Sequence, residues 1–127
     1  MSRRILLIED EPNIIEAMSF ILARDGWEVH RHGDGEGALE AVAAAAPDVV
    51  VLDVMLPGRS GFDVLRELRA APATAGLPVL MLTARGQKKD RELAAELGVT
   101  RLMTKPSSNA ELVAVLAEIS GQVGGAV

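Results

Sequence analysis

The segment Val49-Val50-Val51-Leu52-Asp53 decides the fold, because four aliphatic residues in a row are followed by one acid. An unbroken run of branched aliphatic residues is typical of a strand buried on both faces of a parallel sheet. The loop that follows, Pro57 to Gly61, consists largely of small and turn-forming residues. Because ligands of open α/β sheets bind beyond the carboxyl ends of the strands, Asp53 is the first candidate site residue.

The rest of the chain alternates between short apolar runs and stretches with helical periodicity. Strands are expected at 5–8, 27–30, 49–52, 79–82 and 101–103, and helices at 12–25, 35–45, 61–70, 86–97 and 108–120. Asp34 is expected to cap the second helix. Five strands alternating with five helices predict an α/β fold: a three-layer, doubly wound (βα)5 arrangement around a parallel sheet.

Composition limits the class of protein. A chain of 127 residues, 49% hydrophobic and 24% charged, predicts one globular domain over residues 1–121 and a flexible Gly-rich tail over 122–127. The net charge of −5 argues against a nucleic-acid-binding function. The absence of cysteine excludes disulfides and thiolate metal sites. The first apolar run has only four residues, which is too short for a signal sequence or a membrane span, so we expect a cytoplasmic protein.

Complementary polar groups follow four of the five expected strands. They are Glu9 and Asp10 after the first strand, Asp53 after the third, Thr83 after the fourth and Lys105 after the fifth. Clustered carboxylates favour a hard divalent cation such as Mg²⁺. An ammonium and a hydroxyl beside them suit a phosphoryl group carried by an aspartate. Asp53 is the best candidate for the nucleophile because it ends the central, most apolar strand.

Four motifs together resemble the receiver domain of two-component response regulators, the CheY-like family. They are Ile-Leu-Leu-Ile-Glu-Asp-Glu-Pro (5–12), Val-Val-Leu-Asp-Val-Met-Leu-Pro-Gly (50–58), Leu-Thr-Ala (82–84) and Thr-Lys-Pro (104–106). The similarity extends from about residue 3 to residue 120. It implies a flavodoxin-like fold with strand order 2-1-3-4-5, and a Lys105–Pro106 peptide bond in the cis form.

The resemblance also implies a role for each site residue. Asp53 would accept a phosphoryl group from a sensor histidine kinase or phosphotransfer protein. Mg²⁺ would be held by Asp10, by Glu9 directly or through water, by Asp53 and by the backbone carbonyl of Met55. The phosphoryl oxygens would be bound by the Thr83 hydroxyl, the Lys105 ammonium and the backbone of Ala84.

Three positions depart from the family pattern. Glu9 stands where Asp is commoner, and its longer side chain can still reach metal-bound water. Leu102 replaces the usual aromatic residue, whose inward movement accompanies that of the threonine. Ser107-Ser108 follows Lys-Pro where Phe is frequent. The switch residues are then Thr83 and Leu102, which predicts an unconventional output face or one that works through a rotamer change of Leu102 alone.

The first helix carries two apolar residues outside its expected buried stripe. These are Ile15 and Phe20, and the stripe itself consists of Ile14, Ala17, Met18, Ile21 and Leu22. Isolated exposed apolar residues are normal on protein surfaces. The alternative is a docking patch for a kinase's helical bundle, which the resemblance favours.

Three functions remain open at this point. The first is a phosphorylatable receiver that signals through an unidentified downstream protein, as a monomer or as a phosphorylation-dependent dimer. The second is a receiver-like adaptor that works without phosphorylation. The third, an aspartyl-nucleophile phosphatase, would require a second carboxylate two residues after Asp53, where the chain has Met55. The chain could also be the N-terminal receiver of a longer regulator.

Overall fold

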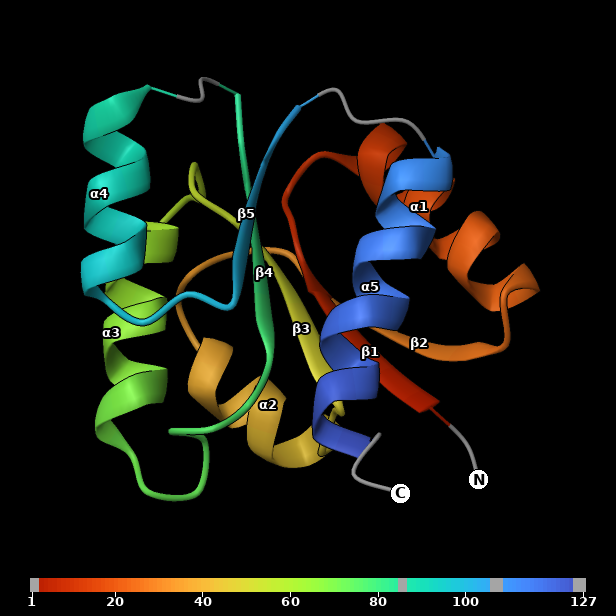
Figure 1. Ribbon diagram of the computed structural model, residues 1–127, viewed down its shortest axis with the longest axis horizontal. Helices are drawn as coiled ribbons and strands as arrows, with labels where there is room; N and C mark the ends of the chain where they lie inside the picture. Colours follow the sequence, from red (N-terminus) through yellow and green to blue (C-terminus); the bar gives the residue numbers. More distant parts are fainter. Residues whose placement is uncertain (1–2, 85–86, 106–108, 125–127) are drawn as a thin grey trace.

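The computed structural model describes residues 3–84, 87–105 and 109–124 as a five-stranded parallel sheet flanked by helices (Figure 1). The strands are β1 (Arg3–Ile8), β2 (Trp27–His32), β3 (Val49–Asp53), β4 (Val79–Thr83) and β5 (Arg101–Thr104). The helices are α1 (Pro12–Arg24), α2 (Ala38–Ala45), α3 (Gly61–Ala70), α4 (Lys88–Glu96) and α5 (Asn109–Gly124). The strand order β2-β1-β3-β4-β5 confirms the predicted flavodoxin-like fold.

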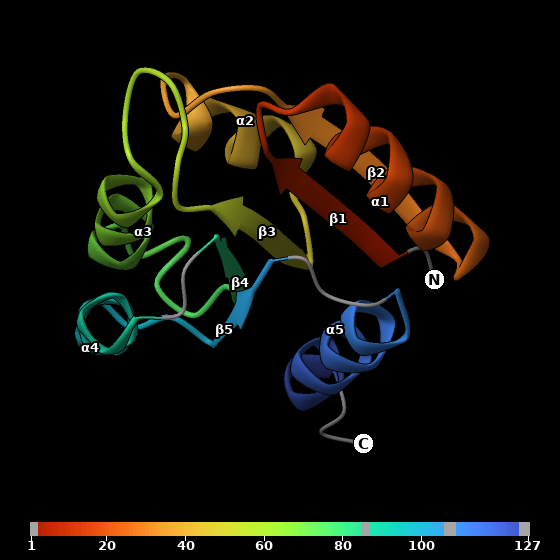
Figure 2. The ribbon, with the colours of Figure 1, turned by 90° about the horizontal axis from the view of Figure 1, so that it is seen from above.

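Alternating side chains of the sheet build two cores, one on each face. Leu6, Val50, Leu52 and Met81 pack with residues of α2, α3 and α4. Their chain neighbours point to the other face and pack with α1 and α5: Ile5, Leu7, Val49, Val51, Leu80 and Leu82. Figure 2 shows the two helical layers on opposite sides of the sheet. The continuous apolar runs are therefore explained by burial on both faces.

Two helix boundaries differ from the prediction by three residues or more. Helix α2 begins at Ala38, three residues later than expected, and its N-cap is Gly37 instead of Asp34. The residues before it form a loop contact instead of a helical turn, since the Gly35 N–H donates to the Pro57 carbonyl at 2.9 Å. Helix α5 continues to Gly124, beyond the expected end at residue 120.

The predicted buried stripe of α1 is correct only in part. Met18 and Leu22 are buried, but Ala17 is exposed at a pocket between α1 and α5. Ser19, which was not predicted to be buried, lies one turn before Leu22 on the inner side of the helix. The side chain of Ser19 is small enough to be buried among apolar residues despite its hydroxyl. Within the described residues, no helix has the length and apolarity needed to cross a membrane.

Two large apolar residues of α1 provide a test of this packing. Leu22 is fully buried and Phe20 is 63% exposed. Leu22→Ala should lower the free energy of unfolding by about 2–5 kcal/mol, because it leaves a cavity in the core. Phe20→Ala should change it by no more than about 0.5 kcal/mol. Urea unfolding followed by the fluorescence of the buried Trp27 measures both, and similar losses in the two variants would contradict the assignment of faces.

Candidate functional site

The strand register brings the predicted site residues to one edge of the sheet. Ile8 pairs with Leu52, so Glu9 and Asp53 follow at the same level on neighbouring strands. Thr83 is the last residue of β4 and pairs with Thr104, directly before Lys105. The backbone N–H of Lys105 donates to the Thr83 carbonyl at 2.7 Å and fixes this corner. The parallel sheet therefore gathers two acids, a hydroxyl and an ammonium from the ends of four strands.

The Lys105 ammonium lies between two acids. Its Nζ is 3.1 Å from Glu9 Oε1 and 3.1 Å from Asp53 Oδ1. The Lys105 side chain is 21% exposed, whereas those of Glu9 and Asp53 are 2% and 4% exposed. Charge pairs in such a poorly hydrated position interact more strongly than surface pairs. This contact connects β5 to the ends of β1 and β3.

Backbone donors hold both carboxylates in place. Glu9 Oε2 accepts hydrogen bonds from the N–H groups of Asp10 and Glu11, at 3.1 and 3.2 Å. Asp53 Oδ1 accepts one from the Met55 N–H at 3.3 Å. The two loops that begin at the sheet edge therefore turn around the carboxylates, which fixes where the acidic oxygens point.

The pKa values show the electrostatic strain in this cluster. Burial raises the pKa of the Glu9 carboxyl, and the hydrogen bond and charge of Asp53 raise it further, against the opposing hydrogen bond from Lys105. Burial alone would lower the pKa of the Lys105 ammonium. Its hydrogen bonds and its attraction to Glu9 and Asp53 outweigh that effect, so its pKa is raised. Lys105 thus stays protonated. Its single positive charge does not fully offset the burial of the Glu9 carboxylate and its repulsion by Asp53, because the pKa of Glu9 remains raised.

A divalent cation fits the donor set of this cluster. Oxygens of Glu9, Asp10 and Asp53 lie within 4.8 Å of one another, and Asp10 is exposed at the mouth of the site. Three carboxylates suit Mg²⁺, which prefers oxygen ligands and retains several waters. Met55 is 72% exposed and contacts the cluster through its backbone, whose N–H donates to Asp53 Oδ1.

A pocket of about 690 Å³ lies beside the acids on the α3–α4 side of the sheet. Its lining includes the predicted residues Thr83 and Ala84, of which Thr83 is buried and Ala84 exposed. Sequence reasoning did not assign the other five lining residues to the site: Val54, Ser60, Phe62, Gln87 and Asp90. Ser60 caps α3 by accepting a hydrogen bond from the Asp63 N–H at 3.3 Å. The available signal was its place directly before the predicted helix 61–70, two residues before Phe62.

The remaining predicted residues lie outside the acidic cluster. Leu102 is half-buried and packs against the same core as Phe62, on the α2–α4 face. Ile15 and Phe20 lie on α1, where Ile15 is half-buried. Pro106, on which the predicted cis peptide depends, and Ser107-Ser108 lie outside the described residues.

Comparisons with known proteins agree with this geometry. Residues 5–117 match the family model of the response regulator receiver domain. A predicted response regulator from Chloroflexus aurantiacus J-10-fl has a similar structure, with a TM-score of 0.90 and 32% identity over 95% of this chain and 99% of that one. The chemotaxis response regulator CheY4 of Vibrio cholerae gives a TM-score of 0.88 and 27% identity over 94% and 99% of the two chains.

A third solved structure is the receiver domain of a sensor histidine kinase from Pseudomonas aeruginosa PAO1. It has a TM-score of 0.87 and 30% identity over 95% of this chain and 99% of that one, and a magnesium ion is coordinated in its active-site cleft. The chain described here belongs to the response regulator receiver domain family. Members of this family are in general signalling modules of two-component systems and not enzymes.

Replacement of Lys105 tests the electrostatic account of the site. Lys105→Met leaves two nearly buried carboxylates without their ammonium and should lower the free energy of unfolding, in the presence of EDTA, by about 1–3 kcal/mol. The loss stays below the about 3–5 kcal/mol of a fully buried pair because Lys105 is partly exposed. It should shrink as the pH falls, because a protonated Glu9 no longer repels Asp53. Lys105→Arg keeps the charge and should lose less; a Met variant as stable as the wild type would refute the account.

Proposed function

We propose that this protein is a phosphorylatable receiver in which Asp53 accepts a phosphoryl group from a phosphohistidine. The observation that carries the proposal is the position of Lys105 Nζ, 3.1 Å from both Glu9 and Asp53, beside three clustered carboxylates. A purely structural ion pair needs neither the third acid nor a neighbouring hydroxyl. An aspartyl phosphate needs a cation, an ammonium and hydroxyl or backbone donors around its oxygens.

The proposed reaction is an in-line phosphoryl transfer. A carboxylate oxygen of Asp53 attacks phosphorus, a P–O bond forms, and the P–N bond of the phosphohistidine breaks with its electron pair returning to the imidazole nitrogen. Lys105 and the Thr83 hydroxyl then bind phosphoryl oxygens, together with the backbone N–H of Ala84. Mg²⁺ held by Asp10, Glu9 and the backbone of Met55 would supply positive charge for the oxygens of the transferring group.

The phosphatase alternative lacks its second acid. A Met side chain that is 72% exposed occupies position 55, so no carboxylate two residues after Asp53 can act as acid and base. The adaptor alternative does not require Asp10, Thr83 and Lys105 to converge on Asp53. A phosphorylated receiver does require that convergence, so we favour it and expect it to act in the cytoplasm through protein contacts.

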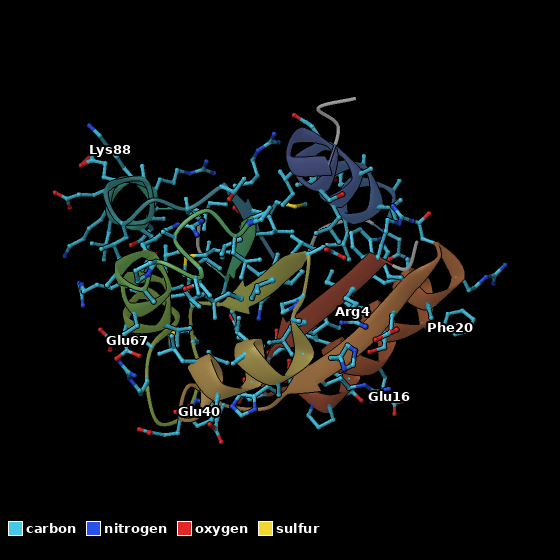
Figure 3. All side chains as sticks on the ribbon, turned by 90° about the horizontal axis from the view of Figure 1, so that it is seen from below. Arg4, Glu16, Phe20, Glu40, Glu67 and Lys88 are labelled. Carbon is cyan, nitrogen blue, oxygen red and sulfur yellow. The ribbon has the colours of Figure 1, made fainter. Side chains whose placement is uncertain are left out.

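We further propose that the phosphohistidine partner docks on α1. This helix begins at Pro12, next to the acids, and Phe20 lies on its exposed surface. Asn13 and Ala17 line a pocket of about 300 Å³ between α1 and α5 that also includes Lys105. Phe20 follows Ala17 by three residues and therefore extends the same side of the helix. In Figure 3, Phe20 and Lys88 of α4 lie on opposite sides of the molecule, so the pocket beside α4 stays accessible during such docking.

Phosphorylation of Asp53 can be tested with a small acyl phosphate as donor. The wild type should gain the mass of one phosphoryl group in the presence of Mg²⁺ and none in EDTA. Asp53→Asn should abolish the gain and keep the cooperative unfolding of the wild type. Asp63→Asn, on the surface of α3, is the matched control and should react normally. Absence of an adduct in the wild type would leave the adaptor as the better description.

The docking surface can be tested by comparing phosphorylation by a phosphohistidine protein with phosphorylation by a small acyl phosphate. Phe20→Ala should lower the rate of phosphotransfer from the cognate phosphohistidine protein by about tenfold, which corresponds to about 1.4 kcal/mol of lost binding. Its rate with a small acyl phosphate should stay unchanged, because Phe20 does not touch the acids. Ile15→Ala should have a smaller effect, because Ile15 is half-buried and points away from Ala17 on the helix. Lys88→Ala, on the opposite side of the molecule, should have no effect. If all variants accepted the phosphoryl group from the protein donor at the same rate, the docking surface would not lie on α1.

A further inference from the structure

Two loops pack against each other at the edge of the sheet that carries the acids. The loop between β2 and α2 contributes Gly35 and Glu36, and the loop between β3 and α3 contributes Pro57 to Arg59; we call this contact the loop clasp. The Gly35 N–H donates to the Pro57 carbonyl at 2.9 Å. A Cβ atom on Gly35 would overlap the Arg59 carbonyl oxygen and lie 2.7 Å from the Arg59 Cβ. The clasp therefore leaves no room for a side chain at position 35.

Further contacts hold the Pro57–Arg59 side of the clasp. The Arg59 N–H also donates to the Pro57 carbonyl, at 2.9 Å. The Arg59 side chain forms an ion pair with Glu67 of α3. At Gly58, whose φ is +82°, a Cβ atom would lie 2.7 Å from the Glu36 Cγ. The two loops are thus packed together at two successive positions.

The clasp links the end of β1 to the loop that follows Asp53. The Glu9 N–H donates to the His32 carbonyl at 3.1 Å, which ties the end of β1 to the start of the β2–α2 loop. That loop reaches Pro57 through Gly35. From Pro57 the chain runs back two residues to Met55, whose N–H donates to Asp53 Oδ1 at 3.3 Å. A displacement of Pro57 therefore moves the backbone that faces the cation site.

We propose that Gly35 is a positioning residue for the cation and phosphoryl site: its N–H and its missing side chain set the place of the Pro57–Arg59 loop, and through it that of the Met55 backbone. The inference rests on the function proposed above. Gly35 itself touches neither the acids nor a phosphoryl group. Its effect is steric and geometric, and shifts of about 1 Å at such sites can cost about a hundredfold in rate.

The chain provides a matched control on the same loop. A Cβ atom at Gly33 would meet nothing within 4 Å, whereas one at Gly35 collides with Arg59. Gly35→Ala should raise the Kd for Mg²⁺, measured by isothermal titration calorimetry, by about tenfold or more. Its rate of phosphorylation by a small acyl phosphate should fall at low Mg²⁺ and recover as Mg²⁺ is raised. Gly33→Ala should stay within about twofold of the wild type in both measurements.

Stability separates positioning from a general structural effect. Urea unfolding in EDTA is measured for both variants; a loss of stability in Gly35→Ala with an unchanged Kd for Mg²⁺ would contradict the positioning role. Glu67→Ala, which releases Arg59 from the exposed surface of α3, should weaken Mg²⁺ binding in the same direction but less.

Amide hydrogen exchange tests the wild-type protein without any substitution. Mg²⁺ should slow exchange of the Gly35 N–H and leave that of Gly33 unchanged, because coupling between the clasp and the cation site acts in both directions. Equal responses of the two amides would overturn the inference. Failure of the wild type to bind Mg²⁺ or to accept a phosphoryl group would instead overturn the proposed function, so the two failures are distinguishable.

Discussion

The contact of the Lys105 ammonium with Glu9 and Asp53 is the interaction on which the site depends. Two nearly buried carboxylates side by side are unfavourable, as the raised pKa of Glu9 shows, and the ammonium 3.1 Å from each makes the arrangement tolerable. One positive charge does not satisfy three acids. The excess negative charge favours binding of a divalent cation at this edge of the sheet. The cation and Lys105 together can then bind the oxygens of a phosphoryl group.

The fold explains why these groups meet. Parallel strands end at the same edge, and the register of β1, β3, β4 and β5 fixes the level at which each polar residue emerges. The apolar runs that precede the polar residues are buried on both faces and keep the strands from shifting. For this reason the convergence of Glu9, Asp53, Thr83 and Lys105 could be predicted from the strand ends. The strand order and the family were instead implied by the resemblance of four motifs to receiver domains.

Features that depend on contacts between loops could not be predicted in the same way. The late start of α2 reflects the contact of Gly35 with Pro57, and no local pattern reports a hydrogen bond over that separation. The exposure of Ala17 depends on how closely α5 approaches α1. Phe62 fits the sequence pattern of a helix, and only the folded structure brings it to the same pocket as Thr83. Helical and strand periodicity specify faces and edges, whereas these features arise from the spacing between elements.

The most direct test of the central claim is the chemical identity of the phosphorylated residue. The protein is incubated with Mg²⁺ and a small acyl phosphate, reduced with borohydride and mapped by peptide mass spectrometry. An acyl phosphate at this site is reduced to homoserine, so the account predicts homoserine at position 53 and at no other aspartate. Unmodified Asp53, or phosphate on a serine, threonine or histidine, would contradict it.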